Sequence, residues 1–237
     1  MGESNVVDFI ARYAILNLMK NKQMPLPFRT RGGRRTGAGR PPNGKKAMVS
    51  HLKRPTFAKI TPAHVTLRIA NDIPSLRSSR RFALIRRCFA KARQNDGMRL
   101  VEFSVLSNHL HLIVEAGSSR ALSRGIQGLC VRLARALNDA LKRSGRVFAD
   151  HFHSELLRSP TRLVNAIRYV WGNAEQHYGN AGMDFFSSEW PAAIELVAQP
   201  QGWLLNAGWL RAPRHLLARL RRLPYGDSLS AESAISR

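Results

Sequence analysis

Hydrophobic and polar residues alternate with two different periods along the middle of the chain, and these periods separate strands from helices. Strand-like segments lie at 64–69, across 98–116 and at 145–156, and the second of them breaks near Ser107 and Asn108. That break predicts a hairpin. Helical spacing of hydrophobic residues predicts three helices, at 74–94, 119–143 and 160–177.

The resulting order, β-α-β-β-α-β followed by a helix, is typical of an α+β fold: a ferredoxin-like antiparallel sheet with helices on one face. The last helix begins at Pro160, and Gly179 is a suitable stop for it. The flanking segments differ in composition. Residues 29–54 are rich in Lys, Arg, Gly and Pro and contain no acidic residue, which predicts a flexible basic arm.

The sequence therefore predicts three parts. Residues 1–62 are an N-terminal extension that includes the basic arm, and residues 63–180 are the ferredoxin-like domain. Residues 181–237 are an appendage that ends in a basic amphipathic helix.

The charge balance indicates a polyanionic partner. Among 237 residues there are 38 Lys and Arg against 15 Asp and Glu, a net charge of +23, so nucleic acid is the expected partner. No apolar run is long enough to span a membrane, and residues 1–20 lack the features of a signal peptide. The two cysteines, Cys88 and Cys130, are expected to be reduced core thiols. These features predict a cytoplasmic, nucleoid-associated protein that does not bind membranes.

Two histidines stand one residue apart in the second strand of the predicted hairpin, in the segment SVLSNHLHLIVEA. Because side chains alternate along a strand, His109 and His111 point to the same face and can chelate one cation. The pattern alone has little specificity, since His151 and His153 repeat it elsewhere.

The helix predicted at 160–177 offers partners for this pair. Tyr169 and Asn173 are four residues apart and share one stripe of the helix. They could simply be a half-buried core aromatic and its solvated neighbour, but Leu163, Ile167 and Val170 already supply an apolar face. Two histidines combined with a tyrosine and a nearby amide are more specific than either pair alone.

These residues resemble the single-tyrosine HUH transposases, in particular the REP-associated tyrosine transposases. The similarity covers residues 64–178 and lies in three places: the segment NHLHLIVE, the segment LARALNDALKRSGRVF, and Tyr169 followed by Asn173. One departure is that Ala174, not proline, follows Asn173. The resemblance implies that 63–180 is an HUH single-tyrosine transposase domain.

The resemblance also implies a reaction. Tyr169 would attack a phosphodiester of single-stranded DNA and form a 5′-phosphotyrosine link, and His109, His111 and Asn173 would bind the assisting metal ion. Mg²⁺ or Mn²⁺ is implied; imidazole ligands suit softer ions better than Mg²⁺, so Mn²⁺ reconciles the two expectations. The expected partner is hairpin-bearing single-stranded DNA, bound by a monomer or a homodimer.

Further residues are candidates for contacting DNA. Gly39-Arg40-Pro41 resembles the centre of an AT-hook, although Ala38 replaces the preceding arginine. Trp171 could stack on a base or simply pack. Four arginines of the helix at 119–143 could contact phosphates: Arg120, Arg124, Arg132 and Arg135. Two other functions remain open, a catalytically decayed DNA-binding protein and a nuclease that uses an activated water.

Overall fold

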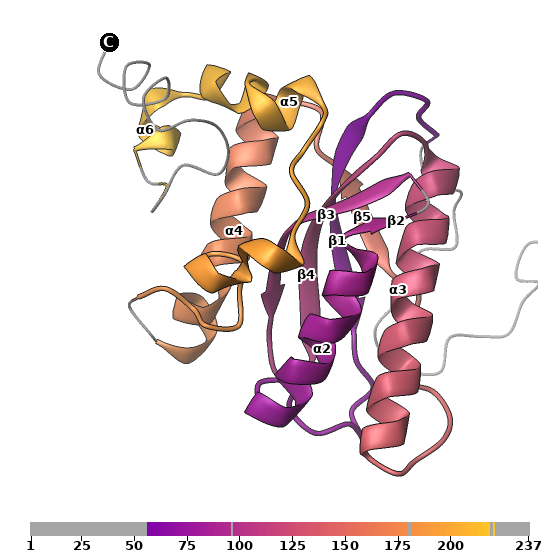
Figure 1. Cartoon of the computed structure of the whole chain (residues 1–237). Coiled ribbons are helices and arrows are strands. Elements are labelled where there is room, and N and C mark those ends of the chain that lie inside the picture. The colour runs from indigo at the N-terminus through magenta and orange to yellow at the C-terminus, as the bar shows by residue number, and fades with distance from the viewer. Residues whose placement is uncertain (1–55, 96, 180–181, 219, 221–237) are drawn as a thin grey trace, which may run out of the picture. The chain divides into compact units, whose positions relative to one another are not determined.

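The computed structural model describes residues 56–95, 97–179, 182–218 and 220 (Figure 1). The chain divides into two units, 1–45 and 46–237, and all described residues belong to the second. The whole of the expected basic arm, residues 29–54 with Arg40, lies outside the described residues. The proposed division at 62/63 and 180/181 therefore stays a prediction.

A five-stranded antiparallel sheet forms the centre of the second unit, with the strand order β2-β3-β4-β1-β5. The β3–β4 hairpin has the predicted position, and the α+β class is confirmed. The strands are β1 (Thr61–Arg68), β2 (Gln94–Asn95), β3 (Met98–Val105), β4 (His109–Ala116) and β5 (His153–Leu156).

The strand predicted at 145–156 is shorter than expected. Gly145 has a φ of 95°, and the Arg146 guanidinium donates to the carbonyls of Phe148 and Ala149. Those two backbone acceptors are therefore engaged by a side chain, and only an isolated bridge joins Phe148 to Ile69. Regular pairing with β1 starts at His153.

Three long helices begin at serine caps. The hydroxyls of Ser78, Ser118 and Ser159 each accept a hydrogen bond from the backbone N–H three residues on, which satisfies a donor of the first turn. Gly179 ends the last of them with a φ of 69°. The helices are α2 (Ser79–Ala92), α3 (Ser119–Ala140) and α4 (Pro160–Tyr178).

Shorter helical turns follow α4. The expected basic helix is seen only as α6, a single turn, because most residues after 218 lie outside the described part. These turns are η1 (Pro191–Leu196), α5 (Trp203–Asn206), η2 (Gly208–Arg211) and α6 (Arg214–Leu217). None of the described helices combines the length and apolar character needed to cross a membrane.

The sheet separates two hydrophobic cores (Figure 1). The predicted pair of helices, α2 and α3, covers one face, where Leu110, Leu112 and Val114 of β4 point. Helix α4 and the turns α5, η2 and α6 cover the other face, around Ile113 and Trp209, whereas η1 packs with α2. The candidate site lies on this second face.

The close approach of α3 to β3 gives a test of the packing. A Cβ at Gly125 would lie 2.6 Å from both Cβ and Sδ of Met98, whereas a Cβ at Gly172 of α4 would meet nothing within 4 Å. Helix propensity alone favours alanine over glycine by about 1 kcal/mol, while overpacking costs about 1–3 kcal/mol. We expect Gly125→Ala to lower the free energy of unfolding by about 1–2 kcal/mol in urea denaturation.

Gly172→Ala is the matched control and should raise the unfolding free energy by up to about 1 kcal/mol. Equal effects of the two substitutions would contradict the packing of α3 on Met98.

Candidate functional site

Histidines from three strands gather on the face of the sheet that α4 covers. In the antiparallel register Thr66 of β1 lies opposite both His111 of β4 and His153 of β5, so the three share one face. His64 of β1 points the same way, and its Nε2 lies 3.2 Å from Nδ1 of His111. The rings of His109 and His111 are stacked, with centroids 6.1 Å apart and an interplanar angle of 9°.

Tyr169 of α4 lies directly against this cluster. Its ring meets His111 edge-on, with centroids 5.2 Å apart and an interplanar angle of 89°, and its centroid is 5.6 Å from that of His64. The Tyr169 side chain is nevertheless 43% exposed. The fold thus brings the predicted tyrosine and histidines, 58 residues apart at His111 and Tyr169, into one accessible site within a single chain.

Asn173 is buried one helical turn beyond Tyr169. It is fully buried, and neither its Oδ1 nor its Nδ2 has a hydrogen-bond partner. A buried amide without partners costs free energy, so a position of this kind calls for a ligand or another explanation. A carbonyl oxygen without a partner is a type of atom that binds cations, and Asn173 as a metal ligand stays a prediction.

The histidine nitrogens are engaged in a way that leaves one nitrogen of each ring available. Nδ1 of His109 lies 2.7 Å from Oδ1 of Asn108, and because an amide oxygen only accepts, this nitrogen donates. Nδ1 of His111 contacts His64 and, at 3.3 Å, Oγ1 of Thr66. Both Nε2 atoms are left for another ligand, the arrangement typical of metal-binding histidines.

A metal ion held here would need a third ligand other than a histidine, cysteine or carboxylate. Within the described ranges no group of three such residues is placed to hold an ion. Binding of a metal ion at this site would therefore need the Asn173 amide, or oxygen atoms of a substrate, as the third ligand.

The environment keeps the imidazoles neutral. Burial lowers the pKa of His111 to about 3, and the neighbouring His64, His109 and His177 act in the same direction. Burial also lowers the pKa of His64, against the opposing effect of Glu155. For His109, burial again lowers the pKa, helped by the positive charge of Arg68. Neutral imidazoles are the form that binds metals.

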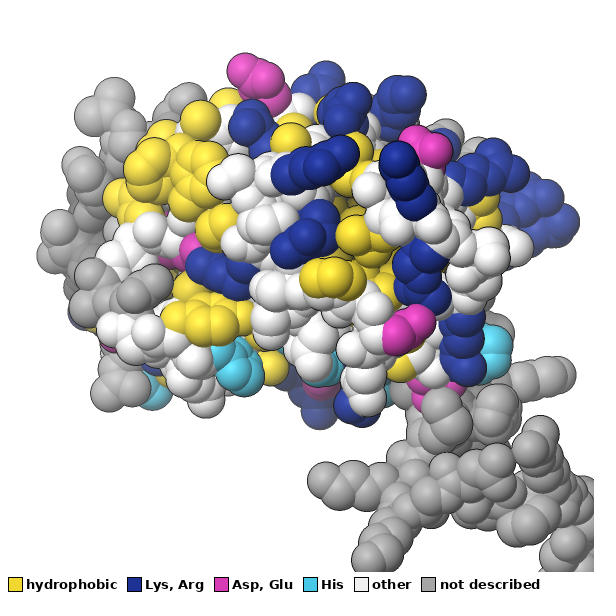
Figure 2. Space-filling model, turned by 90° about the horizontal axis from the view of Figure 1, so that it is seen from below, with side chains coloured by type: hydrophobic (Ala, Val, Ile, Leu, Met, Phe, Trp, Pro, Cys, Tyr) yellow, Lys and Arg dark blue, Asp and Glu magenta, His cyan; other side chains and the backbone are white. Residues whose placement is uncertain are grey.

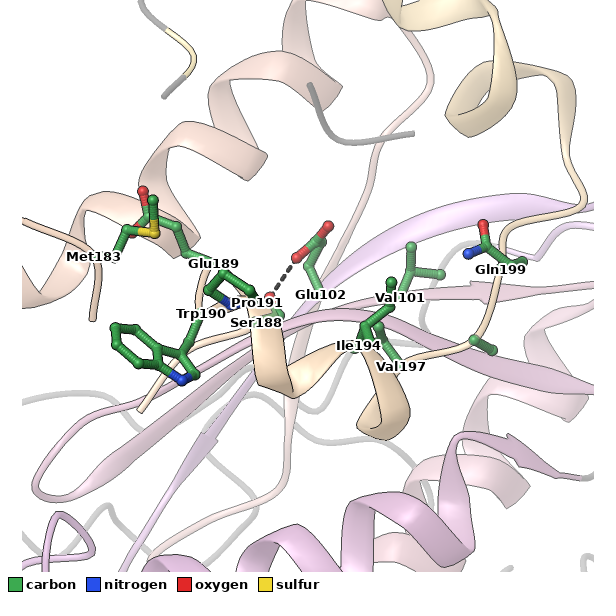
Figure 3. Close-up of a pocket in the computed structure, with 11 residues that line it drawn as sticks. Val101, Glu102, Met183, Ser188, Glu189, Trp190, Pro191, Ile194, Val197 and Gln199 are labelled. Carbon is green, nitrogen blue, oxygen red and sulfur yellow. Dashed lines mark hydrogen bonds between the residues drawn. The ribbon is translucent and has the colours of Figure 1, made fainter. Parts of the chain in front are cut away.

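A buried carboxylate of the sheet holds α4 in place. Glu102 of β3 accepts a hydrogen bond from Nε1 of Trp171, at 3.0 Å. It accepts another from the hydroxyl of Ser188, which Figure 3 shows. Trp171 is only 2% exposed. The suggestion that Trp171 stacks on a base is therefore wrong for this conformation; its indole packs and fixes the helix. An acidic pocket of about 280 Å³ adjoins Glu102.

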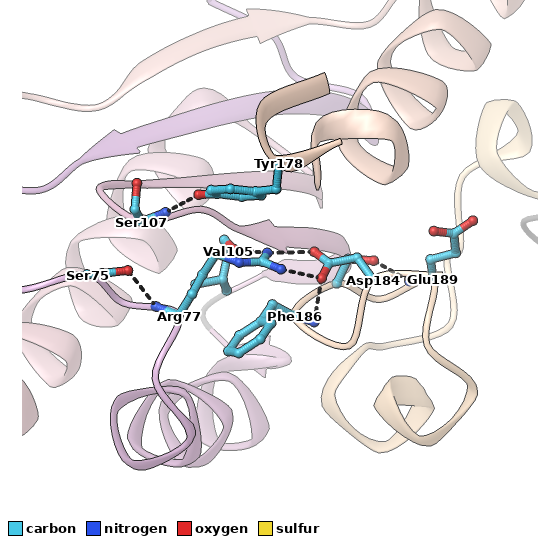
Figure 4. A network of polar contacts seen from close by, with 9 residues as sticks. Ser75, Arg77, Val105, Ser107, Tyr178, Asp184, Phe186 and Glu189 are labelled. Atoms are coloured by element: carbon cyan, nitrogen blue, oxygen red, sulfur yellow. Dashed lines mark hydrogen bonds and ion pairs between the residues drawn. The ribbon is translucent and has the colours of Figure 1, made fainter. Parts of the chain in front are cut away.

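The C-terminal end of α4 is attached to the hairpin turn. The hydroxyl of Tyr178 accepts a hydrogen bond from the backbone N–H of Ser107, at 2.9 Å (Figure 4). Arg77 lies over the Tyr178 ring and forms a bidentate ion pair with Asp184, at 2.7 and 2.8 Å. This network fixes α4 beside the strand that carries the histidines. Tyr178 thus has a structural hydrogen bond, although at 40% it is nearly as exposed as Tyr169.

The predicted arginines do not surround the site. They all lie on α3, on the opposite face of the sheet, and three of the four are exposed: Arg120, Arg124 and Arg135, with Arg132 half-buried. Figure 2 shows Lys and Arg side chains spread over the upper and right-hand parts of that view, with histidines along its lower edge. Arg68, opposite His109 in the register, is a cation beside the site that periodicity did not identify.

Two solved structures are similar to part of the chain. One is a REP-associated tyrosine transposase bound to a REP hairpin, with a TM-score of 0.49, 16% identity, and coverage of 58% of this chain and 81% of the other. The second is a proposed transposase from Deinococcus radiodurans R1, with a TM-score of 0.37, 14% identity, and coverage of 50% and 94%. No family model matches the chain, and no curated protein matches it in sequence.

The buried His111 gives a pH test. Its folded pKa, about 3, lies below the ordinary value of 6.5, so the unfolded chain takes up a proton first as the pH falls. The contribution of neutral His111 to the free energy of unfolding is complete above pH 6.5. It is lost progressively at lower pH, and the loss is roughly 2 kcal/mol at pH 5. We expect the unfolding free energy of the wild type, measured in urea with a chelator, to fall more steeply from pH 7 to 5 than that of His111→Gln. Parallel curves for the two proteins would contradict this.

Proposed function

We propose that the protein is a transposase-like enzyme that cleaves and rejoins single-stranded DNA through a covalent link to Tyr169. One observation carries the proposal: an accessible tyrosine lies against a pair of neutral histidines and one turn from an orphaned amide. The resemblance of the His-Leu-His and Tyr-Asn segments to HUH transposases rests on the sequence alone.

Tyr169 is the attacking group in this proposal. Its phenolic oxygen forms a bond to phosphorus while the bond from phosphorus to the 3′ oxygen breaks. The products are a 5′-phosphotyrosine and a free 3′-hydroxyl, and the proton lost by the phenol equals the proton gained by the 3′ oxygen. The covalent link preserves a phosphodiester, so strand rejoining needs no nucleotide cofactor.

The residues that would hold a divalent ion are His109, His111 and Asn173, with Mn²⁺ or Mg²⁺ as the ion. The two free Nε2 atoms and the amide oxygen supply three ligand atoms, and phosphate and water supply the oxygen ligands that these ions prefer. A bound ion would offset the negative charge that develops on the phosphate.

Two features of the site favour a DNA strand as substrate. Tyr169 is exposed enough for a phosphate to approach, and Arg68 places a fixed positive charge next to His109. The net charge of +23 would draw any polyanion to the protein and make binding strongly salt-dependent.

The covalent intermediate gives a direct test. We expect incubation of the full-length protein with hairpin-bearing single-stranded DNA and Mn²⁺ to give a protein–DNA adduct on a denaturing gel. Tyr169→Phe should abolish the adduct because it removes the nucleophile. Tyr178→Phe is the matched control, because it removes the other phenolic hydroxyl of the same helix. It also removes one hydrogen bond that positions α4, so it should lower the yield of adduct without abolishing it.

The same assay separates the alternative functions. A water-activating nuclease would cut DNA without an adduct and would survive Tyr169→Phe, but it would fail with His109→Ala. A decayed DNA-binding protein would bind the hairpin and produce neither adduct nor cut. Either result would refute the proposed reaction.

The side chains next to Nδ1 of His109 and His111 give a test that does not measure DNA cleavage. Thr66→Val keeps the side-chain shape but removes the oxygen near Nδ1 of His111, and Asn108→Ala removes the acceptor of His109. Loss of such a partner weakens metal binding by about 10–100-fold. We expect both variants to show this loss when Mn²⁺ binding is measured by calorimetry. His215→Gln, on α6, should bind like the wild type.

A further inference from the structure

The helices on the other side of the sheet form a groove with basic walls. The groove lies between α2 and α3 and has a volume of about 530 Å³. Arg87 and Lys91 line it from α2, Arg132 and Arg135 line it from α3, and Asp139 is its one acidic residue. Each wall carries cations about one turn apart, so a ligand lying along the groove would meet several of them.

Within the described part of the chain these four cations have no ion-pair partner, although Asp139 also lines the groove. The ion pairs in that part involve Arg77, Arg143 and Arg162. Arg132 is the most constrained, because its Nη1 is buried without an acceptor and packs 3.3 Å from where a Cβ at Gly128 would be. A desolvated guanidinium nitrogen without an acceptor is costly, and an anion would satisfy it.

The thiol of Cys88 lies in the groove, where it is influenced by the surrounding cations. Cys88 is 6% exposed. Burial raises the pKa of its thiol, while the positive charges of Lys91, Arg132 and Arg87 act in the opposite direction. Three cations from two helices are thus close enough to act on one sulfur atom.

The chemistry of the groove favours a phosphodiester backbone over a membrane surface. Helices that bind membranes present large apolar side chains beside their cations, whereas Val131 is the one large hydrophobic that α2 and α3 expose. The arginine forks match phosphate oxygens, and the open groove can accommodate a chain of phosphates. The pocket at Glu102 is unsuited to such a ligand because two glutamates line it.

We propose that the groove between α2 and α3 binds the phosphate backbone of a nucleic acid, on the face of the sheet opposite Tyr169. The inference goes beyond the proposed function, since it assigns a second binding surface and does not require that Tyr169 cleave DNA. A strand bound at Tyr169 and the backbone in the groove would be different segments of nucleic acid, separated by the sheet.

Salt dependence tests the groove directly. The full-length Arg132→Gln/Arg135→Gln variant is compared with Arg211→Gln/Arg214→Gln, which removes the same charge from two exposed positions outside the groove. Binding of a fluorescent hairpin DNA is measured by anisotropy over a range of salt concentrations. Loss of two phosphate contacts should reduce the slope of log K against log salt by about 1.8. The control pair should change the slope much less.

Because Arg132 is partly buried, a second variant keeps the test independent of folding. Arg87→Gln/Lys91→Gln alters two exposed residues of α2 and should reduce the slope by a similar amount. In a further measurement, bound DNA should protect Lys91 from acetylation, as detected by mass spectrometry, but should leave the exposed Lys59 reactive.

Equal slopes for the groove and control variants would overturn the inference, as would the absence of Lys91 protection. It would also be overturned if the groove variants lost binding to vesicles of anionic lipid while DNA binding was unchanged. Failure of adduct formation at Tyr169 would leave these measurements intact, so the two proposals can fail separately.

Discussion

The antiparallel pairing of β1 with β4 is the constraint on which both the core and the site depend. Its register places Thr66 opposite His111 and Leu67 opposite Leu110. Because neighbouring residues of a strand face opposite sides, the leucines enter the core under α2 and α3 while the histidines face α4. A slip of one residue would exchange the two sets, burying imidazoles in the larger core and exposing leucines to the site. The hydrophobic core therefore fixes the register that aligns the histidines.

Alignment of the histidines is useful only if α4 is equally well fixed, and polar contacts do this at two points, one of them buried. Glu102 holds Trp171 near the middle of the helix, and the Arg77 network holds Tyr178 at its end. Buried charges are costly to desolvate. Their contribution here is that hydrogen bonds have a preferred direction, so they fix the rotation of the helix about its axis more closely than apolar packing does. Tyr169 lies two residues before Trp171, so the rotation that buries the indole also turns the phenol toward His111.

Local patterns were enough to predict the hairpin and the cap at Gly179, because both depend on residues close in sequence. The expectation that Tyr169 lies near the histidines depended on the resemblance to HUH transposases as well, because these residues are far apart in the chain. The burial of Trp171 could not be predicted in the same way, because it depends on the distant Glu102. The face of the sheet on which Arg132 lies could not be predicted either, because it depends on how whole helices pack. His64 is an intermediate case: its strand was predicted, but its contact with His111 needs the register of β1 against β4.

The two faces of the sheet differ in electrostatic character, and this difference has a physical basis. On the α4 face, burial and mutual repulsion keep His111 and its neighbours neutral, so their nitrogen lone pairs stay available. On the α2–α3 face the groove cations are arginines and a lysine. Arg68 is a positive charge beside His109, whereas the groove cations attract nucleic acid without repelling a metal ion at the imidazoles, because the sheet and its core lie between. Separation by the sheet thus allows one small domain to combine a neutral ligand cluster with a strongly basic surface.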